Sequence, residues 1–117
     1  KEKSFRAFFN PEKMKKMMPK YYQKVPEALR ENRGRARELL INCREALEYK
    51  NLYGSERHEI KILREGVLFS SDTIITDQKI FMVGYSEKEV VGTEIWNEEL
   101  AKTQKEIFEM VWGGINK

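Results

Sequence analysis

The spacing of apolar residues predicts a helical segment near the N-terminus. Asn10, Pro11 and Glu12 form a helix start signal, because Asn can cap a helix, Pro is tolerated at the first helical position and Glu is favoured by the helix dipole. Apolar residues then recur at intervals of three and four positions: Met14, Met17, Met18, Tyr21, Tyr22, Val25 and Leu29. Pro19 and Pro26 interrupt the pattern, so we expect a kink, or a short helix followed by a second helix that starts at Pro19.

The middle of the chain fits two secondary structures. Its apolar positions satisfy helical spacing from Leu39 to Leu47, whereas residues 39–42 also suit a short buried strand, and periodicity alone does not decide. A turn at Gly54 and Ser55 follows. Apolar and charged residues then alternate over residues 58–63, which predicts a strand.

The last third of the chain predicts an antiparallel meander and a final helix. Residues 73–76, 79–85 and 90–96 form three β-rich runs separated by polar turns. Asn97 can cap a helix that has Glu98 in its first turn, where negative charge is favoured. One face of that helix is largely apolar, with Leu100, Gln104, Ile107, Phe108, Val111 and Trp112, and the helix is expected to end at Gly113 and Gly114.

Length and composition limit the possible classes of protein. The chain has 117 residues, so we expect a single domain over residues 1–117. No apolar run approaches the roughly 18 residues that a membrane span needs. A single cysteine, Cys43, excludes an intrachain disulfide and indicates a small buried hydrophobe in a reducing cytoplasm. The sequence begins without Met and without a signal peptide, so we expect a fragment with a neighbouring domain missing.

Charge is divided unequally along the chain. Residues 1–37 carry a net charge of +8 and residues 38–117 a net charge of −5, which gives +3 overall. A basic segment of this kind can contact a phosphate backbone, or equally the acidic part of its own chain or of a partner. Direct nucleic-acid binding is the less favoured alternative, because no base-reading motif accompanies the charge.

One stretch resembles the edge of an enzyme active site that has lost its reactive side chains. In the phospholipase D superfamily a nucleophilic His and a phosphate-binding Lys precede an Asp, with the spacing His-x-Lys-x4-Asp-x6-Gly-Ser. This sequence keeps Asp77 and, after six residues, Gly84. The His and Lys positions hold Ser70 and Asp72, and Tyr85 replaces the final Ser. Phosphodiester transfer by this route needs an imidazole nucleophile and a cation, so the resemblance implies no catalytic residue.

A narrower resemblance is to the C-terminal effector domain of TrmB-type transcription regulators, which join a winged helix-turn-helix to a phospholipase-D-like domain lacking the catalytic His and Lys. It covers roughly residues 16–112, and its most specific parts are the C-terminal hairpin, the Gly-Thr-Glu-Ile run, the Asn/Glu-capped helix and the Phe-x3-Trp ending. The resemblance implies an α/β fold: a phospholipase-D-like half whose mixed sheet has an antiparallel C-terminal meander, flanked by N-terminal and C-terminal helices. It also makes residues 35–42 a core strand and residues 43–53 a helix.

The same resemblance implies a non-enzymatic regulatory domain that senses a small molecule, dimerises, or does both. DNA would be bound by a separate domain, and neither a cofactor nor a metal is expected. The former active-site cleft would be the ligand pocket, lined by Ser70, Asp72, Asp77 and Tyr85. The alternative is structural, because Asp77 is favoured in a turn and Gly84 permits close strand packing.

Several apolar positions are predicted to form either the core or a homodimer interface: Met14, Met17, Met18, Tyr21, Tyr22, Phe108 and Trp112. A homodimerisation or protein-interaction module without a ligand is therefore the alternative function. A phosphodiesterase or nuclease is less favoured, since His58 lies outside the motif and is interpreted as a surface or strand-end histidine.

Overall fold

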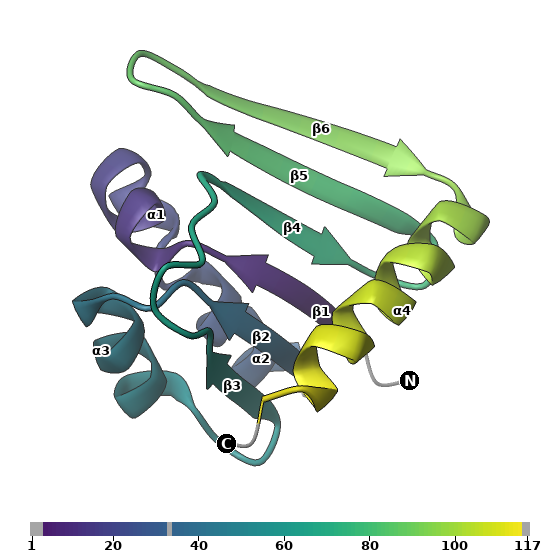
Figure 1. Cartoon of the computed structure of the whole chain (residues 1–117), viewed down its shortest axis with the longest axis horizontal. Coiled ribbons are helices and arrows are strands. Elements are labelled where there is room, and N and C mark those ends of the chain that lie inside the picture. The colour runs from purple at the N-terminus through teal and green to yellow at the C-terminus, as the bar shows by residue number, and fades with distance from the viewer. Residues whose placement is uncertain (1–3, 33, 116–117) are drawn as a thin grey trace.

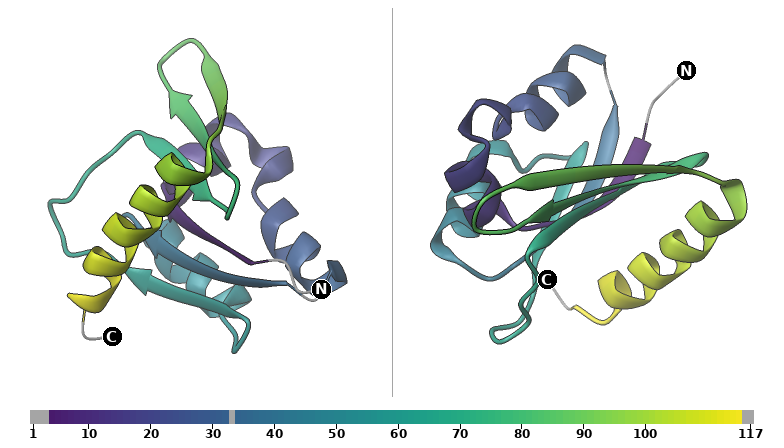
Figure 2. Two further views of the ribbon diagram at one scale, coloured as in Figure 1. Left: turned by 90° about the vertical axis from the view of Figure 1, so that its right-hand side faces the viewer. Right: turned by 90° about the horizontal axis from the view of Figure 1, so that it is seen from above.

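Six strands form one mixed sheet that has helices on both faces (Figures 1 and 2). The computed structural model describes residues 4–32 and 34–115. The strands are β1 (Ser4–Phe9), β2 (Arg35–Leu40), β3 (His58–Ile62), β4 (Ser71–Ile75), β5 (Lys79–Tyr85) and β6 (Val90–Trp96). The helices are α1 (Pro11–Met17), the 3-10 turn η1 (Pro19–Tyr21), α2 (Lys24–Asn32), α3 (Arg44–Tyr53) and α4 (Glu98–Gly113).

The sheet has the strand order β3-β2-β1-β4-β5-β6. Strand pairing changes from parallel to antiparallel at its centre, between β1 and β4. β1, β2 and β3 are parallel, because helical crossovers through α1–α2 and through α3 return the chain to the same edge each time. β4 is antiparallel to β1, and β4, β5 and β6 form a meander of tight hairpins. The predicted α/β class, mixed sheet, antiparallel meander and flanking helices are thus confirmed.

The sheet separates two hydrophobic clusters. On the face covered by α1, α2 and α3, which we call the helix-rich face, the buried cluster is Phe9, Leu40, Ala46, Tyr49 and Ile60. On the opposite face, the α4 face, the buried cluster is Leu39, Leu63, Ile75 and Phe108. Leu39 and Leu40 are both fully buried although they are neighbours in β2, because successive side chains of a strand point to opposite faces.

The N-terminal segment matches the prediction only in part, because a 3-10 turn, η1, starts at Pro19 and the second helix, α2, begins at Lys24. Asn10 Oδ1 accepts a hydrogen bond from the Lys13 N–H, and α1 is interrupted before Pro19 as expected. The central strand β1 was missed, although Phe5, Ala7 and Phe9 alternate with the other residues of that strand. Within the described parts of the chain, none of the helices is both long and apolar enough to cross a membrane.

The residues predicted to form the core or an interface differ in their burial. Phe108 has no exposed surface and stacks on Trp112, so its predicted interface role is wrong: the α4 face of the sheet covers it. Trp112 is half-buried beneath the Arg37 guanidinium and the Lys61 amine, which lie 5.2 and 4.5 Å from its ring centre. Met14 and Tyr22 pack against the core, Met17 and Met18 are half-buried, and Tyr21 is exposed.

Replacement of Phe108 by Ala should lower the free energy of unfolding by about 3–5 kcal/mol, because it leaves a cavity between α4 and the sheet. Urea denaturation measures this difference. The matched control is Met110→Ala in the same helix: Met110 is 76% exposed, and its loss should change stability by less than about 0.5 kcal/mol. Equal effects of the two substitutions would contradict the assignment of α4 to the core.

Candidate functional site

Asp72 lies buried where the parallel and antiparallel halves of the sheet meet. It projects from β4 to the helix-rich face, and only 3% of its surface is exposed. Its Oδ1 accepts a hydrogen bond of 2.7 Å from the Asn10 backbone N–H, and its Oδ2 accepts one of 2.6 Å from the Tyr85 hydroxyl. Both carboxylate oxygens are therefore occupied by groups of the protein itself.

Asn10 ties three segments together at the same place. Its backbone N–H binds Asp72, its Oδ1 caps α1, and its Nδ2 donates a hydrogen bond of 2.7 Å to the Phe69 carbonyl oxygen. The end of β1, the start of α1 and the loop before β4 are thus joined through one residue. The sequence predicts the cap but not the other two roles, which depend on contacts between distant segments.

Burial raises the pKa of Asp72 to about 6, because the carboxylate is removed from water. The hydrogen bonds from Tyr85 and Asn10 act in the opposite direction, and the charge of Glu38 adds to the rise. The same burial, with the Asp72 charge beside it, raises the pKa of the Tyr85 hydroxyl, so that this group stays a donor. Within the pair, Asp72 is therefore the group whose charge changes near neutral pH.

The four residues expected to line one ligand pocket do not come together. Tyr85 and Asp72 are hydrogen-bonded, and the Tyr85 N–H also donates to the Ser70 carbonyl oxygen at 3.0 Å, while the Ser70 side chain is exposed. Asp77 lies at the other end of β4, in the turn before β5, where it forms an ion pair with Lys105 of α4. The expectation of a shared pocket is wrong, because Asp77 lies five positions beyond Asp72, and the extended β4 strand carries the chain away from Asp72 to the turn that holds Asp77.

A second buried polar cluster lies on the same face, on β2 and β3. Glu38 Oε1 accepts hydrogen bonds from His58 Nε2 at 2.6 Å and from the Tyr49 hydroxyl at 2.8 Å. His58 is the first residue of β3 and is 3% exposed, so the strand-end interpretation is correct and the surface interpretation is wrong. Burial and the Glu38 charge raise the pKa of Tyr49. The phospholipase-D-like motif did not indicate this cluster. The signal in the sequence was Glu38, an acidic residue beside the apolar Leu39 and Leu40.

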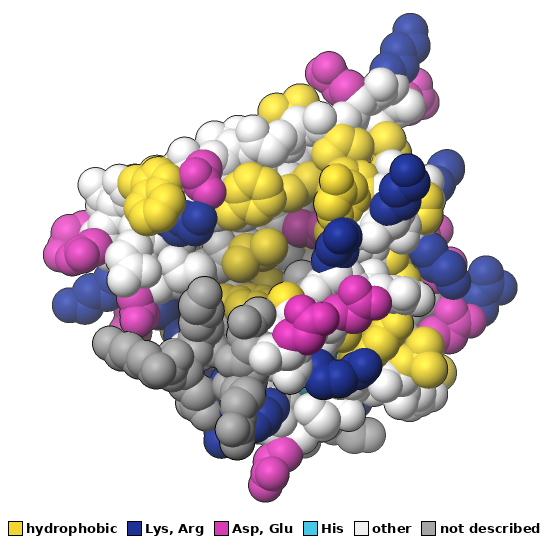
Figure 3. Space-filling model, turned by 180° about the vertical axis from the view of Figure 1, so that it is seen from behind, with side chains coloured by type: hydrophobic (Ala, Val, Ile, Leu, Met, Phe, Trp, Pro, Cys, Tyr) yellow, Lys and Arg dark blue, Asp and Glu magenta, His cyan; other side chains and the backbone are white. Residues whose placement is uncertain are grey.

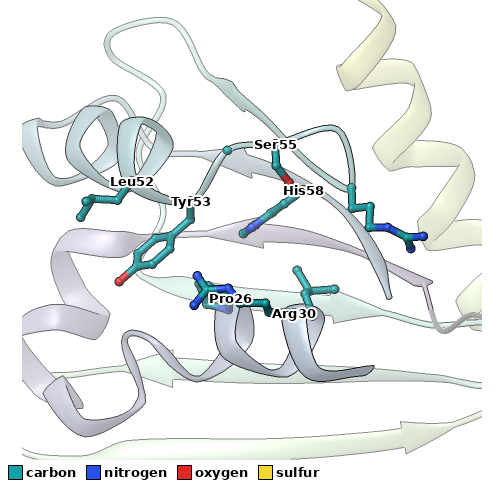
Figure 4. Close-up of a pocket in the computed structure, with 9 residues that line it drawn as sticks. Pro26, Arg30, Leu52, Tyr53, Ser55 and His58 are labelled. Atoms are coloured by element: carbon teal, nitrogen blue, oxygen red, sulfur yellow. The ribbon is translucent and has the colours of Figure 1, made fainter. Parts of the chain in front are cut away.

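A groove of about 410 Å³ lies between α2 and the C-terminal end of α3 (Figure 4). Side chains of Arg30, Tyr53 and His58 point toward a common space in it, and Ser55 lies beside His58. Arg57 also lines the groove. The apolar part of the groove wall consists of Pro26, Leu29 and Leu52. The groove thus lies next to the buried Glu38–His58 pair, with His58 at its floor.

The chemistry of this groove suits an anionic small molecule. The Arg30 guanidinium can bind carboxylate or phosphate oxygens in a bidentate manner, and the hydroxyl groups of Tyr53 and Ser55 can orient such a ligand. The volume falls within the range of roughly 300–1,000 Å³ that is typical of small-molecule sites. In the part of the chain that the structure describes, no group of three or more His, Cys, Asp or Glu side chains is placed to hold a metal ion.

The antiparallel half of the sheet is only partly covered on the helix-rich face. Figure 3 shows hydrophobic side chains gathered over this area, which is hollowed beside the helices. Ile74, Phe81 and Val90 are half-buried there, and Trp96 is 66% exposed. Lys79 lies 4.5 Å from the ring centre of Trp96 and forms an ion pair of 2.7 Å with Glu94.

Comparisons with known proteins gave no relative: no family model matches the chain, and no curated protein matches it.

Replacement of Asp72 by Asn should remove a pH-dependent part of the stability. Because the folded pKa of about 6 exceeds the ordinary value of 3.8, the folded protein holds a proton between these pH values that the unfolded chain has released. The free energy of unfolding should therefore fall as the pH rises from about 4 to about 6. Asn can keep both hydrogen bonds, with Nδ2 donating to the Tyr85 hydroxyl, and cannot ionise.

Urea denaturation at several pH values tests this difference between the two proteins. The stability of Asp72→Asn relative to the wild type should increase by about 2 kcal/mol between pH 4 and pH 7. A difference that is constant with pH would contradict the buried, raised-pKa carboxyl.

Proposed function

We propose that this chain is a non-enzymatic regulatory domain that responds to a small anionic molecule, as its resemblance to TrmB-type effector domains implies. The observation that carries the proposal is the state of Asp72. It stands where a phospholipase-D-like enzyme has its phosphate-binding Lys, and both of its oxygens are hydrogen-bonded inside the protein. A buried acidic group at this position repels a phosphodiester, and the exposed Ser70 supplies no imidazole.

The α2–α3 groove is the proposed effector site. Arg30 lies on α2, whereas Tyr53, Ser55 and His58 lie on α3 and the loop that leads into β3. A ligand bound by both sides would hold α2 against α3, and α2 otherwise packs chiefly on η1. Binding would in this way be converted into a change in the position of the basic N-terminal helices.

The resemblance extends the proposal to partners outside this sequence. A separate winged helix-turn-helix would bind DNA, the protein would be a cytoplasmic homodimer, and the effector would alter the relation between the two DNA-binding domains. A second candidate is a homodimerisation module without a ligand, which the partly covered β4–β6 face favours.

Phosphorylated sugars, nucleotides or small carboxylic acids should raise the melting temperature of the protein, because a ligand that binds only the folded state stabilises it. The Arg30→Ala variant should bind the active compound about tenfold more weakly or worse, since a hydrogen bond to a charged group contributes about 1.5–3 kcal/mol. Thermal-shift assays and calorimetric titration measure both quantities.

Arg44→Ala is the matched control for this experiment, because Arg44 lies at the other end of α3 and its side chain is 82% exposed. This variant should bind the compound as the wild type does. Equal loss in both variants would indicate a non-specific charge effect. A panel without any stabilising compound would contradict the ligand-responsive function and favour the assembly module.

The protein should not hydrolyse a generic phosphodiester such as bis(4-nitrophenyl) phosphate, because the described site has neither nucleophile nor phosphate-binding cation at the motif positions. Spectrophotometric turnover of the purified chain should equal that of buffer. A rate above buffer that disappears in a His58→Gln variant would overturn the non-enzymatic assignment.

A further inference from the structure

β6 is an edge strand whose outward backbone groups are set by its register with β5. The pairing runs without a break from Lys79↔Trp96 to Tyr85↔Val90. Hydrogen bonds from the Ser86 N–H to the Glu89 carbonyl and from the Asn97 N–H to the Gln78 carbonyl lie at its two ends. Since hydrogen-bonded pairs alternate along an antiparallel ladder, the odd-numbered residues of β6 bond to β5. The N–H and C=O groups of Val90, Gly92, Glu94 and Trp96 therefore point away from the sheet.

This edge lacks the features with which proteins usually prevent strand pairing. Such edges are commonly short, bulged, or marked by Pro and Lys. The β6 sequence Val-Val-Gly-Thr-Glu-Ile-Trp has neither residue and a single charge, and that charge is already paired with Lys79. Val91 and Trp96 are 51% and 66% exposed. The opposite edge strand, β3, differs because it carries both Glu59 and Lys61.

The β6 sequence is complementary to itself in one register. Two copies related by a two-fold axis normal to the sheet keep each face of the sheet continuous. An even-numbered residue of one β6 strand therefore faces an even-numbered residue of the other, and an odd-numbered residue faces an odd-numbered one. An axis at Thr93 pairs all seven residues: Val90 with Trp96, Val91 with Ile95, Gly92 with Glu94, and Thr93 with itself. Every outward N–H and C=O then finds a partner, and apolar side chains meet on both faces.

Neighbouring registers are worse for specific reasons. An axis at Glu94 would place two carboxylates directly opposite each other, which destabilises a strand pair. An axis at Gly92 would leave Ile95 and Trp96 beyond the paired segment, opposite the polar turn that contains Lys88 and Glu89. Only the Thr93 register sets Glu94 against a residue without a side chain while using the full strand.

We propose that two copies of this chain pair edge to edge through β6, antiparallel and with the two-fold axis at Thr93, so that one sheet runs through both copies. The occupant of the edge is a second copy because the strand that fits it is β6 itself. This inference depends on the geometry of β6 and not on the presence of an effector. It places the interface away from Met14, Tyr22 and Phe108, which the core uses.

Disulfide trapping tests the register directly. The background is Cys43→Ala, so that the introduced cysteine is the only thiol. Across the proposed interface Thr93 faces Thr93 in a non-hydrogen-bonded pair, with Cα atoms about 4.5 Å apart, which is within the range of a disulfide. Thr93→Cys should therefore oxidise to a covalent dimer on a non-reducing gel.

Val91→Cys is the matched control, since Val91 is exposed on the same face of the same strand. In the proposed register residue 91 faces residue 95, so Val91→Cys alone should remain monomeric on the gel, whereas a mixture with Ile95→Cys should cross-link. Cross-linking of Val91→Cys as fast as that of Thr93→Cys would overturn the register.

Sedimentation velocity of the uncross-linked chain tests the dimer itself. The wild type should sediment as a dimer, and Thr93→Lys should sediment as a monomer, because two ammonium groups would meet at the axis. Thr103→Lys adds the same charge on the exposed side of α4 and should leave the dimer intact. A wild type that is monomeric at every concentration would overturn the proposal, as would a dimer that survives Thr93→Lys.

Discussion

A buried carboxylate at the centre of the sheet is the constraint on which this fold depends. Asp72 receives one hydrogen bond from the backbone of Asn10 and one from the hydroxyl of Tyr85. These bonds join β4 to the β1–α1 junction on one side and to β5 on the other. A buried polar group without such partners would cost roughly 1–3 kcal/mol or more, so the three segments have to keep their relative positions. The parallel and antiparallel halves of the sheet are fastened together at this point.

The same constraint explains why the position does not support phosphodiester chemistry. A phosphate-binding site requires a cation whose hydrogen bonds are directed at the ligand. Asp72 has the opposite charge, and its hydrogen bonds are directed into the protein. The groups that can bind an anion lie elsewhere, in the α2–α3 groove, where the buried Glu38 holds His58 in place behind Arg30 and Tyr53. The buried Asp72 cluster and the proposed effector site are therefore separate polar groups on one face of the sheet.

The sequence predicted local structure well and long-range contacts poorly. The caps Asn10 and Asn97, the three runs of the meander and the glycine end of α4 are local signals, and the structure contains all of them. β1 was missed because its strand structure depends on pairing with β2 and β4, which a short run of residues does not reveal. The prediction of a shared pocket was wrong for a similar reason. The motif spacing placed Asp72 and Asp77 together, whereas Asp72 lies near the start of β4 and Asp77 lies in the turn after β4. The groove could not be predicted, since Arg30 and His58 meet only through tertiary packing.

Asp72 acts as an internal hydrogen-bond acceptor and not as part of a binding cleft. The most direct measurement is a carbon-13 NMR titration of the Asp72 side-chain carboxyl, with the Tyr85 hydroxyl proton observed in the same samples. We expect a titration midpoint near pH 6 and a hydroxyl proton protected from exchange with water above that pH. A midpoint near pH 4 together with a rapidly exchanging hydroxyl would show a solvated carboxylate and contradict the account.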